Sequence, residues 1–325
     1  MRIYNILSLF ALLLLTSTLC AQYNSQNLKL DMSGAILKNY TYKNLGIYPV
    51  RSNDVFRMAH REIGTYTNLA DAIEKKKIVV TETSGGANNS RGGSSGVVNT
   101  LMAKNVSADS IYIMAGELVK GGKQDRVIAQ DIIIAPGESV DLSVFCVEQG
   151  RWSYSGEPQS GFSNYEGVSG IGVRKAAEVE KNQGKVWDMV ASDLKTSDTN
   201  SLTSNYNALL NSDKLKKEME DYAGHFTNAY KNDADIIGVV VVSGDKVIAC
   251  DLFATHQLFT SNYENMLQSY IVEAILKGEK VSATPETVNQ YLEKILADES
   301  KQEEVVKSQG NMFKHNGKKI RISSY

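Results

Sequence analysis

The chain has little proline, histidine, cysteine and tryptophan, and each shortage excludes a class of protein. Its 325 residues include 4 Pro, 4 His, 3 Cys and 2 Trp. So few prolines exclude a long proline-rich linker or stalk. The histidines are scattered, and no Cys-x-x-Cys or His-x-x-x-His pair occurs, so the sequence predicts no zinc site and no cofactor. A carboxylate-only calcium or magnesium site stays open.

The chain also lacks a surplus of positive charge. Lys and Arg number 35 against 37 Asp and Glu, which gives a net charge of −2 at pH 7. Proteins that bind nucleic acid normally carry a basic surplus, so we predict no nucleic-acid partner. Hydrophobic residues make up 42% of the chain, which is an ordinary share for a globular protein, and a substantial core is therefore expected.

Long apolar runs are missing too, apart from a short one near the start. Residues 1–21, MRIYNILSLFALLLLTSTLCA, combine a positive charge with an apolar run and small residues after it. The run falls short of the roughly 18 residues that a membrane-spanning helix needs. We therefore predict a signal peptide cleaved after Ala21 and a periplasmic or secreted protein. Cys20 leaves a lipid anchor open, although Leu19 is not the small residue that precedes a lipidated cysteine.

Strand-like and helix-like segments follow one another in blocks along the rest of the chain. Short apolar strands with Gly/Pro turns fill 97–150, helices are predicted over 173–197 and 206–231, and a hairpin follows at 235–253. This order predicts an α+β fold, in which several helices pack on a central antiparallel β-sheet or sandwich made from 97–150 and joined by 235–253. The mature chain divides into a polar segment, a main domain, and a C-terminal helix and hairpin packed on that domain: 22–45, 46–278 and 279–325.

Two predicted strands carry a carboxylate on the face that their alternation assigns to the core. In SVDLSVFCVEQ the apolar alternation continues to Glu148, and in DSIYIMAGELV it continues to Glu117. A carboxylate that points inward without a partner is costly, so cations should lie close to both. The candidates nearest in sequence are Lys123, Arg126 and Arg151.

Four motifs carry a family resemblance. GELVKGGKQDRV, CVEQGRW, KVWDMV and GDKVIACDLF, in this order, resemble the ADP-ribosylglycohydrolase- and rhodanese-phosphatase-associated protein domain family, a family of unknown function. The resemblance covers about 46–278. The family's name implies contact with ADP-ribose or phosphoester metabolism and establishes no activity. The polar positions that the resemblance implies are Glu117, Lys123, Gln124, Arg126, Cys146, Glu148, Arg151, Trp152 and Asp251, with Phe253 in the late hairpin.

The first of three functional hypotheses is a ligand-binding domain for a small anionic or nucleotide-like molecule. The adjacent Gly121 and Gly122 can turn backbone N–H groups toward an anion, and arginine recognises carboxylate or phosphate at two points. Cations would face the anion, amide and carboxylate groups would add directional hydrogen bonds, and an indole would stack or pack. The residues with these roles are Lys123, Gln124, Arg126, Glu148, Arg151 and Trp152. Asp251 either joins them or caps the loop that follows its strand.

The second and third hypotheses use the same residues differently. A hydrolase of phosphoester or glycosidic bonds would use Glu117 and Glu148 as its acid and base. In a structural or surface-interaction protein, the polar residues would instead form a buried clamp at the rim of the sheet. The choice depends on whether these side chains are open to solvent.

Cys146 and Cys250 are the two cysteines outside the predicted signal. Export permits a disulfide between them, yet both lie in apolar strands, where buried free thiols are common. Their spacing leaves both states open. No histidine accompanies Cys146 in its motif, which favours a small buried hydrophobic residue over a nucleophile.

Overall fold

The computed structural model describes four ranges of the chain, namely 23–33, 38–83, 99–151 and 161–325. The predicted signal peptide, the glycine-rich segment at 84–96 and Trp152 lie outside these ranges. The described residues form helices and antiparallel sheets, which confirms the predicted α+β class. None of the helices within them is long and apolar enough to cross a lipid bilayer.

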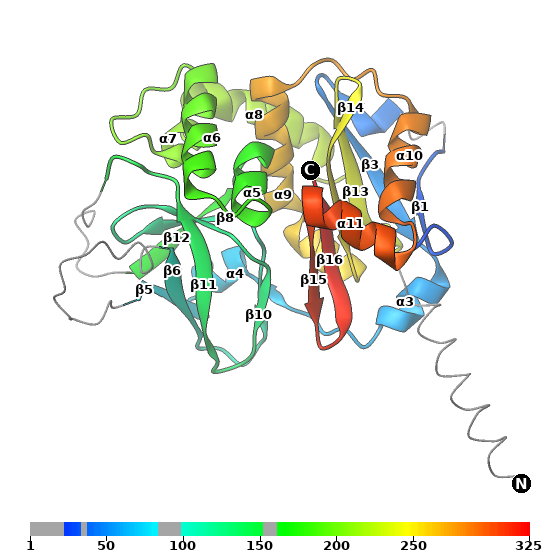
Figure 1. Cartoon of the computed structure of the whole chain (residues 1–325), viewed down its shortest axis with the longest axis horizontal. Coiled ribbons are helices and arrows are strands. Elements are labelled where there is room, and N and C mark those ends of the chain that lie inside the picture. The colour runs from blue at the N-terminus through cyan, green and yellow to red at the C-terminus, as the bar shows by residue number, and fades with distance from the viewer. Residues whose placement is uncertain (1–22, 34–37, 84–98, 152–160) are drawn as a thin grey trace, which may run out of the picture.

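Six strands close into a barrel, which lies at the lower left of Figure 1. In barrel order these strands are β11 (Ser139–Cys146), β6 (Thr100–Asn105), β5 (Ile78–Glu82), β12 (Gly161–Val168), β8 (Glu117–Gly121) and β9 (Arg126–Ile128). Alternate residues such as Val119, Ile128 and Val144 fill the barrel with one apolar cluster. A small sheet beside the barrel contains β10 (Ile132–Ile134), β7 (Ile111–Ile113) and β4 (Thr67–Asn68). Helix α4 (Leu69–Glu74) adds Leu69 to the same cluster, and the Asn68 side chain caps its first turn.

A seven-stranded antiparallel sheet forms the other half of the molecule. Its order is β1 (Leu28–Leu30), β3 (Leu45–Ser52), β13 (Ile236–Ser243), β14 (Lys246–Phe253), β16 (Lys318–Ser324) and β15 (Gly310–His315), and β2 (Thr41–Tyr42) pairs with β3. Strand β13, with the sequence IIGVVVVS, is buried over its first seven residues, as expected for a central strand covered on both faces.

The predicted single sheet from 97–150 and 235–253 was wrong in its pairing. The 235–253 hairpin forms β13 and β14, which pair with β3 on one side and β16 on the other, whereas the strands of 97–150 belong to the barrel and the small sheet beside it. The reason is physical, because a strand that is apolar on both faces fits the centre of any sheet. Its alternation therefore does not specify its partners.

Helices cover both halves, and one of them joins the halves together. The bounds are α3 (Asp54–His60), α5 (Ile171–Glu178), α6 (Gln183–Thr196), α7 (Tyr206–Leu210), α8 (Asp213–Phe226), α9 (His256–Lys277), α10 (Pro285–Ile295) and α11 (Glu299–Gln309), with a 3₁₀ turn η1 (Lys38–Tyr40). Helix α9 contacts β12 of the barrel as well as β13 and β14 of the sheet, and lies between the two halves in Figure 1. Thr284 caps α10 with Pro285 in its first turn, as the sequence predicts.

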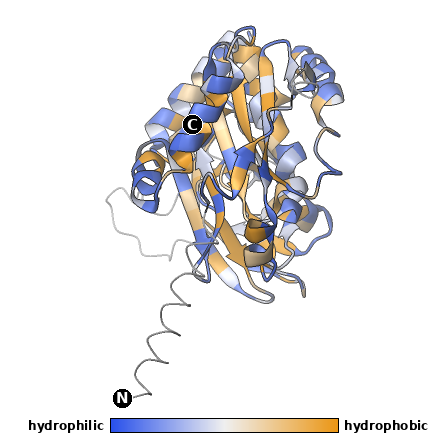
Figure 2. Cartoon of the chain, turned by 90° about the vertical axis from the view of Figure 1, so that its right-hand side faces the viewer, coloured by the Kyte–Doolittle hydropathy of each residue, from blue (hydrophilic) through white to orange (hydrophobic). Residues whose placement is uncertain are grey.

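The apolar residues collect where these layers meet. In Figure 2 the strands are mostly orange and the outer helices are mostly blue. One cluster joins the sheet to α9, one fills the barrel, and a third lies between the outer barrel face and helices α5 to α7. Leu118 and Val127, for example, point outward to the helices, while their neighbours Val119 and Ile128 point into the barrel.

Both described cysteines are free and buried. Cys146 lies in β11 of the barrel and Cys250 lies in β14 of the sheet. Of the two states that the sequence allowed, a disulfide or two free thiols, the structure contains the free thiols. Burial raises the pKa of both thiols, which keeps them protonated and unreactive near neutral pH.

Candidate functional site

The motif GELVKGGKQDRV folds into the hairpin of β8 and β9. Leu118 lies opposite Val127, and the alternation places Glu117 and Arg126 on the inner face. Both carboxylates are buried, Glu117 being 0% exposed and Glu148 3% exposed, although Glu148 lies two residues beyond the end of β11, where strand alternation no longer applies. The inner face of the hairpin therefore carries the Glu117 carboxylate at one end and the Arg126 guanidinium at the other. Either charge is costly to bury without a partner.

A group of five polar side chains, which we call the barrel-end cluster, lies at the turn end of this hairpin. Its members are Gln124, Asp125, Arg126, Glu148 and Arg151. The Arg151 Nε donates to Glu148 Oε2 at 2.7 Å, one terminal nitrogen lies 3.1 Å from Asp125 Oδ1, and the other donates to the Gly122 carbonyl at 3.0 Å. One guanidinium thus binds three separate acceptors and ties the two motifs together, as the sequence predicts for Glu148 and Arg151.

Side chains from the loop before α7 and from its first turn take up the remaining carboxylate oxygens of the cluster. Asn205 and Asn207 donate their side-chain N–H groups to Asp125 Oδ2 at 3.0 and 2.8 Å. The Thr203 hydroxyl donates to Glu148 Oε1 at 2.8 Å. These three partners could not be predicted from the sequence, since they lie more than fifty residues away and share no pattern with the hairpin.

Arg126 and Gln124 are the most enclosed positive and amide groups of the cluster. Both are 2% exposed. A terminal nitrogen of Arg126 donates to the Gln124 carbonyl at 2.6 Å, and the other lies 3.9 Å from Glu82 Oε1. Burial lowers the pKa of Arg126. Gln124 Nε2 donates to the Glu148 carbonyl at 2.6 Å, and the backbone N–H of Lys123 donates to Glu82 Oε1 at 2.7 Å.

Glu117 lies at the opposite end of the hairpin from Glu148. Glu117 begins β8, whereas Glu148 lies beyond the end of β11, next to the turn that joins β8 to β9. Glu117 Oε2 accepts the Met114 N–H at 2.7 Å, and burial raises the pKa of Glu117 to about 8. The carboxyl is therefore mostly protonated at neutral pH.

Asp251 belongs to a second group, the central network, which contains Asp131, Arg174, Glu178, Asp251 and Arg321. Arg321 lies 2.6 Å from Asp251 Oδ1, 2.9 Å from Asp131 Oδ1 and 3.1 Å from Glu178 Oε1. Arg174 lies 3.0 Å from Asp251 Oδ1, and the side chains of the network are 0 to 1% exposed. Burial alone would raise the pKa of Asp251, but the two arginines outweigh it and lower that pKa to about 2.

The central network connects the two halves of the molecule. Asp131 follows β9 of the barrel, Arg174 and Glu178 come from α5, and Asp251 and Arg321 come from β14 and β16 of the sheet. Gly116, with a φ of 91°, passes directly beside Arg174, where a Cβ atom would lie 2.6 Å from the arginine Cγ. A side chain at this position would therefore displace the arginine.

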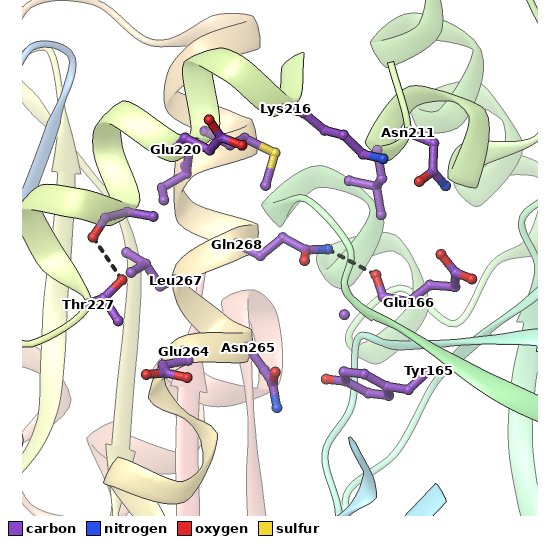
Figure 3. A pocket seen from close by; sticks show the side chains of 15 residues that line it. Tyr165, Glu166, Asn211, Lys216, Glu220, Thr227, Glu264, Asn265, Leu267 and Gln268 are labelled. Carbon is purple, nitrogen blue, oxygen red and sulfur yellow. Dashed lines mark hydrogen bonds between the residues drawn. The ribbon is translucent and has the colours of Figure 1, made fainter. Parts of the chain in front are cut away.

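A cleft opens elsewhere, between the barrel and the helices (Figure 3). Its volume is about 600 Å³. Strand β12 contributes Tyr165, Glu166 and Gly167, while the end of α7 and one face each of α8 and α9 form the rest of the wall. Gln268 of α9 points across the middle, where its Nε2 donates to the Glu166 and Val168 carbonyls at 3.1 and 3.2 Å. The sequence analysis missed this cleft, because its walls come from four separate elements.

A family model covers nearly the whole described chain. The model for the ARG and Rhodanese-Phosphatase-superfamily-associated Protein domain, ARPP-1, matches residues 35–324. The chain belongs to this family. The match extends beyond the range of about 46–278 over which the resemblance was recognised, and it includes β16 with Arg321. No curated protein and no solved structure matches the chain.

Within the ARPP-1 domain, the residues proposed from sequence separate into different surroundings. Gln124, Arg126, Glu148 and Arg151 meet in the barrel-end cluster, together with the Lys123 backbone. Asp251 lies in the central network. Glu117 lies close enough to that network for the charges of Asp131 and Arg321 to influence its pKa. Trp152 lies outside the described residues. Across the described ranges, no group of three His, Cys, Asp or Glu side chains is arranged to hold a metal ion.

Replacing Arg151 with Ala is expected to lower the free energy of unfolding by about 2 kcal/mol. The change leaves the buried carboxylates of Glu148 and Asp125 without their shared cation, although the 16% exposure of the Arg151 side chain lets water compensate in part. Urea unfolding followed by circular dichroism measures the loss. Arg61→Ala is the matched control, because the exposed Arg61 pairs only with exposed Glu62. Equal midpoints for the two variants would contradict the clamp role.

Proposed function

We propose that this ARPP-1 domain is a small-molecule binding domain whose ligand occupies the cleft between β12, α7, α8 and α9. The observation that carries the proposal is the contrast between the cleft and the predicted polar site. The cleft offers about 600 Å³ to a ligand, within the range of roughly 300 to 1,000 Å³ that small-molecule sites have. The barrel-end cluster uses most of its hydrogen-bonding groups on one another, with Gln124 Oε1 and Arg126 Nε as the buried atoms that find no partner in the described chain.

The barrel-end cluster acts, in this proposal, as a structural clamp. For an anion to bind there, Arg151 would have to give up Glu148 and Asp125, which would leave two buried carboxylates unpaired. Arg126 would similarly have to leave the Gln124 carbonyl. The anion-binding hypothesis for these residues therefore requires a rearrangement whose cost the anion must offset. The clamp requires none.

The hydrolase hypothesis receives less support from the geometry. Its two carboxylates lie at opposite ends of the β8–β9 hairpin, and neither is exposed by more than 3%. A substrate bond would have to enter the protein interior to reach either one. We therefore propose binding in preference to hydrolysis.

The cleft is also better enclosed than another groove among the described residues. A groove of about 700 Å³ between α10 and α11 is lined mainly by exposed Lys, Glu, Gln and Ser side chains. The cleft beside the barrel has buried Leu210, Leu267 and Ile271 in its walls. Small-molecule sites usually combine such apolar walls with a few directed polar groups.

Filling the cleft tests the proposal. Ala223 of α8 lines the cleft and is half-buried, so Ala223→Trp places an indole inside it. We expect at least a tenfold loss of affinity for any ligand found in a thermal-shift screen, with a melting temperature close to wild type. Arg151→Ala is the control, because it lies in the barrel-end cluster and not in the cleft. It should lower the melting temperature and leave the ligand affinity unchanged at temperatures where the variant is folded. Full affinity in Ala223→Trp would contradict binding in the cleft.

Export completes the proposal and rests on the sequence of residues 1–21. The apolar run and the small residues before Ala21 support cleavage at that point. Cell fractionation and N-terminal sequencing measure it, with Gln22 expected as the first residue of the exported protein. An uncleaved chain, or a lipid on Cys20, would contradict this part of the proposal.

A further inference from the structure

The shape of the cleft follows from the spacing of the residues on α8. Lys216, Met219, Glu220, Ala223 and Thr227 recur at intervals of three or four and therefore share one helix face. This face runs for about 16 Å along the helix. Helix α9 packs beside α8, and β12 with the end of α7 forms the opposite wall in Figure 3. The cleft is therefore elongated and suits a ligand of several linked units.

The charges around the cleft balance one another. Glu166 lies 3.9 Å from Lys120, and Glu264 lies 2.6 Å from Lys231. The third carboxylate that lines the cleft, Glu220, follows Lys216 at the four-residue helical spacing. Among the described residues that line the cleft there is no arginine, which is the side chain best suited to phosphate and carboxylate recognition. The cleft thus favours neither a strongly anionic nor a strongly cationic ligand.

The polar groups of the cleft both donate and accept hydrogen bonds. Asn211, Asn265 and Gln268 line it, and each side-chain amide has an acceptor oxygen and a donor nitrogen. The Asn265 side chain makes no hydrogen bond to another described residue, and Figure 3 shows it beside Tyr165 at one end of the cleft. The Tyr165 hydroxyl is buried close to Glu117, so the ring is the part of Tyr165 that the cleft offers to a ligand. Ligand hydroxyls, which also donate and accept, are the complementary groups.

The apolar part of the cleft complements the same kind of ligand. Met219, Ala223, Leu267 and Ile271 provide a continuous apolar floor between the polar groups. Tyr165 adds an aromatic ring at one end. A sugar ring carries hydroxyls at its edge and C–H groups on its faces, so it can use the amides and the apolar floor together. A purely apolar ligand would bury the amides without hydrogen-bond partners, which weakens its binding.

From these observations we infer that the cleft binds a neutral, hydroxyl-rich chain, namely an oligosaccharide. The inference rests on the proposed function and adds the chemical class of the ligand. It differs from the anionic or nucleotide-like ligand expected from sequence, because that expectation came from cations that the barrel-end cluster has already paired. In the cleft, the amide of Asn265 and the ring of Tyr165 make the principal contacts, and Gln268 accepts through its Oε1.

An array of neutral and acidic oligosaccharides, followed by calorimetry, tests the inference with the exported form of the chain. We expect a neutral oligosaccharide of three or more units to bind. Its affinity should fall at least tenfold in Asn265→Ala and in Ala223→Trp, and should not change in Asn289→Ala, a matched amide on α10 that contacts Glu293 away from the cleft. Tyr165→Phe retains the ring and removes the hydroxyl, so it should lose less affinity than Tyr165→Ala.

ADP-ribose, inorganic phosphate and spermidine are the charged probes in the same series. If only a charged probe binds, and Ala223→Trp abolishes that binding, the cleft is a ligand site and the inference on ligand class is wrong. If an oligosaccharide binds equally well to wild type and to Ala223→Trp, the proposed place of binding is wrong. Absence of binding to every neutral member of the array overturns the inference whatever the charged probes do.

Discussion

Arg321→Met is expected to cost about 3 to 5 kcal/mol of folding free energy or to prevent folding altogether. Methionine retains a long apolar stem and removes the guanidinium. Asp131, Glu178 and Asp251 would then remain buried with Arg174 as the one cation of the central network. The loss is large because none of these carboxylates can turn to water, their side chains being at most 1% exposed.

Urea denaturation with paired fluorescence and circular dichroism measures the effect of Arg321→Met. Arg61→Met is the control, since 68% of the Arg61 side chain is exposed and its partner Glu62 is also on the surface. A second variant, Arg321→Lys, retains the charge and loses the fork of donors, so an intermediate loss is expected. A loss below about 1 kcal/mol in Arg321→Met would show that the network does not stabilise the fold.

Glu117→Gln is expected to remove a pH dependence from the stability of the protein. Burial raises the pKa of Glu117 from 4.5 to about 8, so the folded state holds a proton that the unfolded state releases between these values. The stabilising effect of the protonated carboxyl is complete below about pH 4.5 and is lost as the pH rises to about 8. At roughly 1.36 kcal/mol per unit, the loss over this window is on the order of 4 kcal/mol.

Glutamine has the shape of the protonated carboxyl and does not titrate. The difference in unfolding free energy between Glu117→Gln and wild type should therefore grow in favour of the variant as the pH rises from 5 to 8.5. Asp193, whose burial raises its pKa to about 6, contributes equally to both proteins and cancels. Glu293→Gln, on the exposed face of α10, is the control. Parallel curves for wild type and Glu117→Gln would show that Glu117 is ionised in the folded protein.

Local features of the fold follow well from the sequence. The alternation in β8 correctly placed Glu117 inside, whereas Glu148 lies two residues beyond the end of β11 and pairs there with Arg151. Asn316–Gly317 forms the turn of the C-terminal hairpin between β15 and β16, with both residues at positive φ. Such features depend on residues within a few positions of one another. Backbone periodicity and turn chemistry therefore suffice to predict them.

Partners from distant segments could not be predicted in the same way. Asp251 was expected near the hairpin cations, yet it pairs with Arg174 of α5 and Arg321 of β16. Arg321 alternates with Ile320 and Ile322, and all three are buried because β16 is covered on both faces. The alternation of residues in such a strand shows which side chains share a face, but it does not show whether either face meets solvent. The sequence pattern around a buried arginine is therefore the same as that around an exposed one.

The site was predicted to the extent that one motif specified it. Glu148 and Arg151 lie three residues apart and form the expected ion pair. The cleft exists because of the way β12 packs near α8 and α9. The sequence of each of these elements, taken alone, predicts only an ordinary amphipathic strand or helix. A concave surface of this kind becomes visible only when the elements are placed in space.

The position of the barrel within the chain sets the order in which the two halves can form. The barrel strands lie between β3 and β13, which are direct neighbours in the sheet. Every barrel pairing joins strands that are closer in sequence than β3 is to β13. Strand β3 cannot pair with β13 until the whole barrel and helices α5 to α8 have followed it in the chain. Short-range pairings close faster than long-range ones, so the barrel should reach its native form first and β13 should complete the sheet in a slower step.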